Sequence, residues 1–241
     1  MKFTITIVAV FVLHLAESLP FGDDVGNMWE RSGEFEGDMV LLPEQKNGLV
    51  EDKYRWPNKE VPYEISNEYT ADEAQFIRDT LTQEYARTCI TVRPRTEADK
   101  NYVYINSQRS GCTSAVGYLG IGPQSLNIAR KGCISYGTIV HEFLHSIGFW
   151  HQQSATERDD YVKINWENIQ EGHEHNFDKY GTNYITSYGL PYDYKSIMHY
   201  GRKAYSKNNK DTITPYEDIE IGSFKVLSDI DIEKISKMFK C

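Results

Sequence analysis

The feature that most constrains this chain is the stretch GTIVHEFLHSIGFWHQQS at residues 137–154, which holds three of the seven histidines. His141 and His145 are four residues apart, so on a helix they lie one turn apart on the same side and can bind one metal ion. Gly148 lets the chain turn sharply out of that helix, because a residue without a Cβ reaches positive φ at no steric cost. His151 follows where the returning chain can supply a third ligand.

Three histidines leave a fourth tetrahedral position of a zinc ion open for water, whereas a structural zinc site normally has four protein ligands, usually including thiolates. Glu142 is rotated off the ligand pair, so it can polarise a water without binding the metal itself. H-E-x-x-H alone can be an accident or a surface pair, but H-E-x-x-H-x-x-G-x-x-H is far more specific. The sequence therefore predicts one catalytic Zn²⁺ per chain, held by His141, His145 and His151.

Composition narrows the class of protein. The 241 residues are 40% hydrophobic and 13% aromatic, which is typical of a globular chain with a buried core. A net charge of -9 without a basic stripe argues against nucleic acid or an anionic membrane as the main partner. Residues 1–18 combine one lysine, a short apolar run and small residues, which is the layout of a secretory signal peptide and too short for a membrane anchor. We expect a secreted, extracellular protein.

Export bears on the four cysteines, Cys89, Cys112, Cys133 and Cys241. In an oxidising compartment they are expected to form two disulfides, for which the sequence allows three connectivities. The competing interpretation is a zinc-thiolate site. It is disfavoured because the chain has no C-x-x-C pair.

The order of elements predicts an α+β fold. Residues 19–46 are acidic and read as an extended leader. Helices are predicted around 69–89, where Thr70 and Glu73 form a capping box, around 133–148, and from Ser228 to the C-terminus. Short strands are predicted at residues 61–66, 90–95, 101–107 and 125–129. We expect two lobes: a twisted mixed sheet plus helices in the N-terminal half, and a loop-rich C-terminal half with a terminal helix.

The extended histidine motif, followed later by YDYKSIMHYG, resembles the metzincin metalloproteases and, within them, the astacin family. The resemblance covers nearly all of the chain after residue 18. It implies a two-lobed catalytic domain with zinc-dependent endopeptidase activity. Met198 matches the family's Met-turn, a buried methionine beneath the zinc. Tyr200 matches the tyrosine that lies beside the zinc and hydrogen-bonds the tetrahedral intermediate.

The leader also carries a resemblance. GEFEGDMVL is similar to the family's propeptide signature, which implies that Asp38 binds the zinc and displaces the catalytic water until the leader is removed. EQKNGLV lies where activation cleavage is expected, implying a trypsin-like activating protease and a mature start near Asn47 or Gly48. The expected division is a signal peptide (1–18), a propeptide (19–46) and a catalytic domain (47–241). The family pattern also implies the disulfides Cys89–Cys241 and Cys112–Cys133.

Two positions depart from the family pattern. Members usually have glutamate directly after the third histidine, where it engages the new N-terminus created by activation, but this chain has Gln152. Glutamine can hydrogen-bond an ammonium but cannot pair with its charge. Ala155 stands where a basic residue is common. These departures leave zinc binding intact and bear on how activation is coupled to the N-terminus.

The main hypothesis is a secreted, monomeric zinc endopeptidase made as a zymogen and acting on proteins or peptides. Glu142 takes a proton from water and passes it to the leaving amine, and Tyr200 stabilises the oxyanion. The strand around residues 125–129 is expected to form the cleft edge to which an extended substrate pairs. The alternative is a non-catalytic secreted binding module that uses zinc only for stability. Substrate preference is not encoded in any motif.

Overall fold

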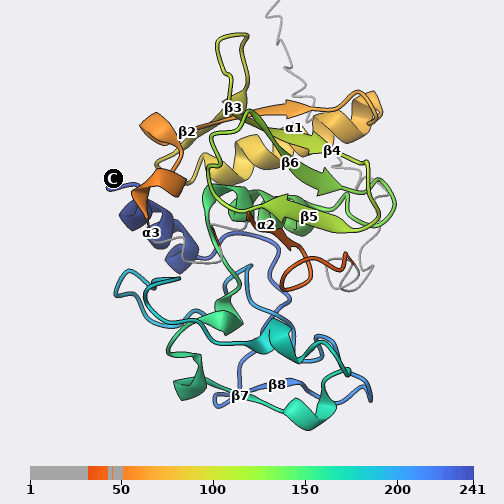
Figure 1. The fold of residues 1–241 in the computed structure, drawn as a ribbon, viewed down its shortest axis with the longest axis vertical. Helices are drawn as coiled ribbons and strands as arrows, with labels where there is room; N and C mark the ends of the chain where they lie inside the picture. The colour runs from red at the N-terminus through yellow and green to blue at the C-terminus, as the bar shows by residue number, and fades with distance from the viewer. Residues whose placement is uncertain (1–31, 43–44, 46–50) are drawn as a thin grey trace, which may run out of the picture.

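The chain folds into two unlike halves, one built on a sheet and one built mainly from loops. The structure is a computed structural model and describes residues 32–42, 45 and 51–241. The sheet and helices α1 and α2 form one half, and the loop-rich half carries a small two-stranded antiparallel sheet, β7–β8 (Figure 1). The chain ends in α3. This is the predicted α+β arrangement.

The described elements have the following bounds. The helices are α1 (Ala71–Tyr85), α2 (Tyr136–Ile147) and α3 (Asp229–Met238). The strands are β1 (Met39–Val40), β2 (Glu60–Ile65), β3 (Thr91–Pro94), β4 (Tyr102–Asn106), β5 (Cys112–Ala115), β6 (Pro123–Ile128), β7 (Val162–Ile164) and β8 (Ile213–Pro215). Short 3-10 turns are η3 (Asp52–Tyr54), η4 (Pro57–Lys59), η5 (Gln152–Ser154), η6 (Arg158–Asp160), η7 (Trp166–Asn168) and η8 (Glu174–Phe177).

The larger sheet has the order β1-β5-β6-β4-β2-β3. Only the β5–β6 pair is antiparallel, with Ser114 opposite Leu126. Strand β1 belongs to the leader and pairs in parallel with β5. The expectation that residues 125–129 form the cleft edge is wrong, because β6 lies between β5 and β4. Outside the leader, the edge strand of this sheet on the leader's side is β5. Its short CTSA sequence has little of the branched or aromatic content that marks strands.

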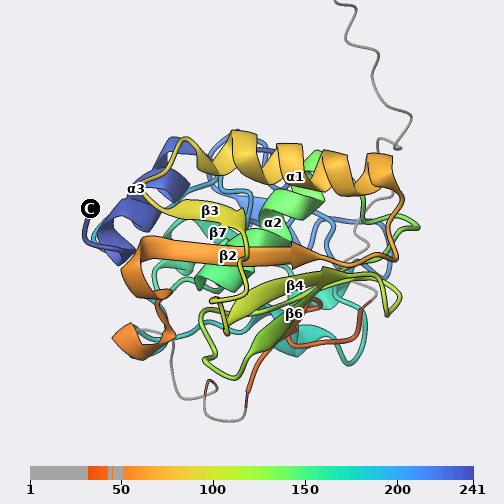
Figure 2. The same cartoon turned by 90° about the horizontal axis from the view of Figure 1, so that it is seen from above.

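Helix α1 begins where its sequence predicts. Thr70 accepts a hydrogen bond from the main chain of Glu73, and the Glu73 side chain accepts one from Thr70 N, which completes the capping box. The helix lies alongside β2 and β3, as the view from above shows (Figure 2). Its buried face meets α2, so the two helices cover the sheet together.

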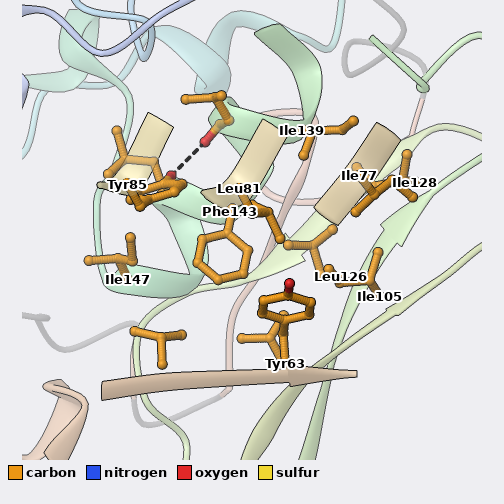
Figure 3. Packing of buried hydrophobic residues seen from close by; sticks show 14 of the residues in the cluster. Tyr63, Ile77, Leu81, Tyr85, Ile105, Leu126, Ile128, Ile139, Phe143 and Ile147 are labelled. Carbon is orange, nitrogen blue, oxygen red and sulfur yellow. Dashed lines mark hydrogen bonds between the residues drawn. The ribbon is translucent and has the colours of Figure 1, made fainter. Parts of the chain in front are cut away.

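The main core lies between these helices and the sheet (Figure 3). Its buried side chains include the following residues of α1, α2 and the central strands: Tyr63, Ile77, Leu81, Tyr85, Ile105, Leu126, Ile128, Ile139, Phe143 and Ile147. Burying each one contributes about 1.5–3 kcal/mol. Tyr85 Oη also donates to the main-chain carbonyl of Val140 at 3.0 Å, which satisfies a hydroxyl inside the core. Helix α2, which carries two of the predicted metal ligands, is therefore held in place by packing against α1 and the sheet.

Two disulfides brace this arrangement. Cys89–Cys241 joins the segment after α1 to the last residue of the chain. Cys112–Cys133 joins β5 to the segment before α2. This is the connectivity that the resemblance implies among the three that the sequence allows. None of the helices in the described part is long and apolar enough to cross a lipid bilayer.

The described part of the leader lies between the two halves (Figure 1). Its carbonyl at Asp38 accepts from Ser114 N of β5 at 2.9 Å. On the other side, Phe35 packs against Trp150 and Tyr180, with ring centroids 5.4 and 6.0 Å apart. Within residues 32–42 the leader thus contains one short strand, β1, with flanking turns. The predicted signal peptide (1–18) and the predicted cleavage segment (46–50) lie outside the described residues.

Candidate metal centre

Helix α2 presents the first two histidines of the motif. Ser135 caps the helix by accepting from Thr138 N at 3.2 Å. Ile139, Phe143 and Ile147 bury one face in the core, and the next face carries His141 and His145. These two rings have centroids 4.8 Å apart and are 8% and 0% exposed. The four-residue spacing therefore places both imidazoles together, as predicted.

The turn after α2 brings back the third histidine. Gly148 ends the helix with φ of 125°, and its N–H donates to the carbonyl of His145 at 2.8 Å. Few side-chain-bearing residues adopt that φ, so glycine is required here. The ring of His151 lies 4.8 Å from that of His145 and 5.3 Å from that of His141. All three histidines of the motif meet in one buried cluster.

Each imidazole is held at Nδ1, which leaves Nε2 for the centre of the cluster. His141 Nδ1 donates to the carbonyl of Ile197 at 2.9 Å, and His145 Nδ1 to that of Phe149 at 2.7 Å. A carbonyl can only accept, so these two rings carry their proton on Nδ1. His151 Nδ1 lies 2.9 Å from Glu36 Oε2. Orienting contacts of this kind at the far ring nitrogen are typical of metal-ligating histidines.

The carboxylate of Asp38 completes a set of four donors. Asp38 Oδ2 lies 3.1 Å from His141 Nε2, and Oδ1 lies 3.4 Å from the Nε2 atoms of both His145 and His151. The Nε2 atoms of His141 and His151 are 3.3 Å apart. Four ligand atoms placed tetrahedrally about 2.0–2.1 Å from a zinc ion are separated by about 3.3–3.4 Å. The donor set and its spacing fit one zinc ion.

Charge supports a cation at this position. Burial lowers the pKa of His145 to about 4, so its ring is neutral near pH 7 and able to act as a ligand. Burial acts in the same direction on His151, but the carboxylates of Asp38 and Glu36 outweigh it and raise the pKa to about 9. The positive charge of the neighbouring imidazoles overcomes burial at Asp38 and holds its pKa well below its usual range. The leader carboxylates thus favour a cation within the histidine cluster.

Glu142 lies beside the cluster with no partner of its own. Its side chain is fully buried, and neither carboxylate oxygen makes a hydrogen bond within the described part of the chain. Burial, followed by the charge of Asp38, raises the pKa of Glu142 well above its usual value. A buried carboxyl without a partner is costly, so it is not explained by a structural role. A raised pKa is instead what a group that accepts and returns a proton needs.

Tyr200 and Met198 lie in the segment that follows Ile197, whose carbonyl holds His141. The Tyr200 ring is 1% exposed and lies 4.7 Å from that of His151, and its hydroxyl donates to the carbonyl of Glu36. Met198 is 1% exposed within the main core, and its carbonyl accepts from Gln152 N at 2.9 Å. Both residues therefore lie close to the metal centre.

Several residues that shape the site are not predicted from the sequence. Glu36 lies two residues before Asp38 in the leader. Residues two apart on an extended chain lie on the same side, and this spacing is the signal that could have predicted that Glu36 faces the site. The carbonyls of Ile197 and Phe149 carry no side-chain signature at all. Lys234 of α3 donates to Gln152 Oε1 at 2.6 Å, although an isolated helical lysine normally indicates a solvated face. Ala155, the second departure from the family pattern, is buried.

Three buried histidines, a neighbouring carboxyl group and a two-lobed α+β fold define the class of mononuclear zinc hydrolases. Comparison with known proteins specifies the family. The model of the peptidase family "Astacin" matches residues 48–240. The chain belongs to the astacin family and is a zinc metalloendopeptidase.

Individual relatives support the assignment to this family. The chain is 42% identical to the low choriolytic enzyme of Oryzias latipes over 217 residues, covering 86% of this chain and 78% of that protein. It is 40% identical over 198 residues to zinc metalloproteinase nas-13 of Caenorhabditis elegans, covering 82% of this chain but only 43% of the longer relative. Against meprin A subunit beta of Rattus norvegicus, identity is 36%, with 86% and 29% of the two chains covered.

Solved structures share the fold. High choriolytic enzyme 1 of Oryzias latipes, a hatching enzyme zinc-protease, aligns with a TM-score of 0.71 and 38% identity, covering 78% of this chain and 93% of that one. Myroilysin aligns with a TM-score of 0.56 at 19% identity, covering 78% of this chain and 97% of that one, and this shows likeness of fold alone.

Proposed function

We propose that this chain is a secreted zinc endopeptidase made as a latent zymogen, with His141, His145 and His151 as the metal ligands. The convergence of their Nε2 atoms on the Asp38 carboxylate, at 3.1–3.4 Å from its oxygens, supports this ligand set. Bound zinc supplies Lewis acidity, which lowers the pKa of a water molecule and polarises the scissile carbonyl. Met198 forms the buried floor of the site.

The remaining chemistry belongs to the protein's own side chains. Glu142 takes the proton from the attacking water and delivers it to the amine that leaves when the C–N bond breaks. Tyr200 donates a hydrogen bond to the oxyanion that develops on the former carbonyl oxygen. The Tyr200 hydroxyl is bound to the leader in the described state, so it becomes available to substrate only when the leader leaves.

Latency rests on three contacts of the leader. Asp38 lies against the Nε2 atoms of the histidines and would occupy the fourth ligand position of a bound zinc ion, which a catalytic site keeps open for water. The carbonyl of Glu36 binds Tyr200, and β1 covers the edge of β5. Cleavage near Asn47 or Gly48 by a trypsin-like protease, after Lys46, would separate the leader from the catalytic domain. An extended substrate would then pair with β5 in place of β1.

The organisation proposed for the chain is a signal peptide (1–18), a propeptide (19–46) and a catalytic domain (47–241). The apolar N-terminal run and the two disulfides support an extracellular protein, which we propose to be a monomer. A net charge of -9 without a basic stripe disfavours a nucleic-acid partner. The chain's substrates are proteins or peptides.

The observation that carries the catalytic proposal is the unpartnered, buried carboxyl of Glu142 next to the three histidines. A binding module that used zinc only for stability would have no use for such a group. We therefore favour the enzyme over the non-catalytic alternative.

The test uses full-length protein trimmed with trypsin and assayed on denatured casein, with and without a chelator. Trimmed wild-type protein should cleave the substrate in a chelator-sensitive manner, and Glu142→Ala should abolish cleavage while one zinc ion stays bound. Full zinc occupancy without cleavage by the wild type would favour the binding module. Wild-type activity in Glu142→Ala would refute the assigned role.

A further inference from the structure

Lys234 is a buried cation that no catalytic role described above uses. It lies on α3 and is 7% exposed. Within the described residues its ammonium donates to Gln152 Oε1 at 2.6 Å, and no carboxylate lies within ion-pair distance of it. The buried carboxylate of Asp193 is the acidic group that attracts it from further away. Burying an ammonium is costly unless it is hydrogen-bonded, so the bond to Gln152 is the contact that holds it in place. The partner it holds directly follows His151.

Helix α3 reaches the metal centre at a second point. Asp231 accepts from Ser196 Oγ at 2.7 Å and from Ile197 N at 3.2 Å. The carbonyl of Ile197 in turn accepts from His141 Nδ1. Helix α3 therefore makes hydrogen bonds next to two metal ligands. Asp231 bonds to Ile197, whose carbonyl holds His141, and Lys234 bonds to Gln152, which follows His151.

Lys234 and Gln152 also line a pocket behind the third histidine. Its charged and titratable walls are Arg55, His151, Glu157, Tyr184, Tyr188 and Lys234. Arg55 Nη2 donates to Tyr188 Oη at 3.0 Å, while its Nη1 and Glu157 Oε1 have no hydrogen-bond partner within the described chain. The permanent charges are two cations against one carboxylate, so a further ammonium gains little by entering.

We propose that Lys234 is a positioning residue that supplies, from within the catalytic domain, the cation that holds Gln152 and through it His151. The metal centre then does not depend on the ammonium that cleavage creates at the new N-terminus. This inference rests on the proposed zymogen function and specifies its regulation. Removal of the leader activates the chain, and moving the cut by a few residues leaves the activity of the product unchanged.

The first arm of the test measures zinc affinity of the trimmed protein by chelator competition, without substrate. Lys234→Met should raise the zinc dissociation constant about 10–100-fold, the usual cost of losing an orienting contact behind a metal ligand. Lys234→Arg should recover most of the affinity. Lys237→Met is the matched control, one turn further on α3 with a 43% exposed side chain, and should leave affinity unchanged.

Gln152→Met removes the acceptor and leaves the lysine in place, so it should show the same loss even if Lys234→Met folds poorly. Thermal unfolding identifies the folded variants. Wild-type zinc affinity in a folded Lys234→Met or Gln152→Met variant would overturn the proposal. Because no substrate is present, a chain that bound zinc but cleaved nothing would defeat only the proposed function.

The second arm varies the new N-terminus. Full-length protein with engineered cleavage sites is cut to begin at Gln45, Asn47 or Gly48, and kcat and KM are measured for each product. The three products should have kcat values equal within about twofold, equivalent to about 0.4 kcal/mol. A tenfold or larger loss of kcat for the product that begins at Gln45 would show dependence on the N-terminus and contradict the proposal.

Discussion

The three imidazoles differ in what holds their Nδ1 atoms. His141 and His145 donate to main-chain carbonyls of residues outside the leader. His151 instead faces Glu36 of the leader, so the proposed removal of the leader would take away this contact. The bond from Lys234 to the adjacent Gln152 involves no leader residue.

Replacing Asp38 should weaken latency in the uncut protein. Asp38→Ala frees the fourth ligand position while Glu36 and β1 still bind the site. We expect uncut Asp38→Ala to cleave a short fluorogenic peptide at least about tenfold faster than uncut wild type, a difference of about 1.4 kcal/mol, but more slowly than trimmed enzyme. Glu34→Ala is the control, since among the described residues the Glu34 carboxylate pairs with the exposed Arg109 and not with the histidines. Equal rates for uncut Asp38→Ala and uncut wild type would contradict a blocking role.

His199 should make the fold sensitive to acid. Its Nδ1 donates to the carbonyl of Tyr200, and its Nε2 lies 2.7 Å from Tyr192 Oη. Burial lowers its pKa to about 4, against about 6.5 in an unfolded chain. Between these values the unfolded state binds more protons, so stability is full above about pH 6.5 and falls as the pH drops towards 4, by about 3 kcal/mol in total.

Urea unfolding at several pH values, compared between wild type and His199→Gln, isolates this contribution because titration of the other groups cancels in the difference. The stability gap between the two proteins should narrow as the pH falls from 6.5 to 4. A gap that is constant over this interval would assign the acid sensitivity to other groups.

At the level of elements, capping residues and periodicity predict the helices, but they do not predict which strand lies at the edge of the sheet. The capping residues Thr70, Ser135 and Ser228 and the glycine at the end of α2 are local features, so the helices could be placed from sequence. Strand β5 has no comparable signal, and which strand lies at an edge depends on the order of pairing across the whole sheet. In the same way, the histidines could be predicted from their spacing, whereas the contact of Lys234 with Gln152 joins residues far apart in the chain.

Gly148 is the residue on which the end of α2 depends. Gly148→Ala places a Cβ at a φ of 125°, where the backbone is strained whatever space surrounds it. The variant should lose about 1–3 kcal/mol of unfolding free energy and bind zinc more weakly, because the turn that returns His151 must shift. Chemical denaturation and zinc competition measure the two effects. Gly181→Ala is the control: its φ is not positive and nothing lies within 4 Å of the added Cβ.

On the scale of the whole molecule, the two halves meet along the leader and at the metal centre. Ser32, Asp38 and Gln45 bond to β5 or to the residues that flank it, whereas Glu36 bonds to Ser154 and Tyr200 of the other half. Met39, Tyr54, Val116 and Trp150 form a separate small core that includes a leader side chain. The described part of the leader therefore belongs to the folded structure as well as lying against the histidines.

Removing the leader should lower the melting temperature. Met39 is fully buried, and burial of a large apolar side chain contributes about 1.5–3 kcal/mol before the entropy of ordering the leader is subtracted. A net loss of about 2 kcal/mol corresponds to a decrease of about 4–8 °C for a domain of this size. Calorimetry on zinc-loaded protein, uncut and cut with the leader removed, measures the change.

Adding a synthetic peptide of residues 32–42 to the cut protein should raise the melting temperature again and inhibit cleavage, because a ligand that binds only the folded state stabilises it. A cut protein that melts at or above the temperature of the uncut chain, unaffected by the peptide, would show that the leader contributes nothing to the fold.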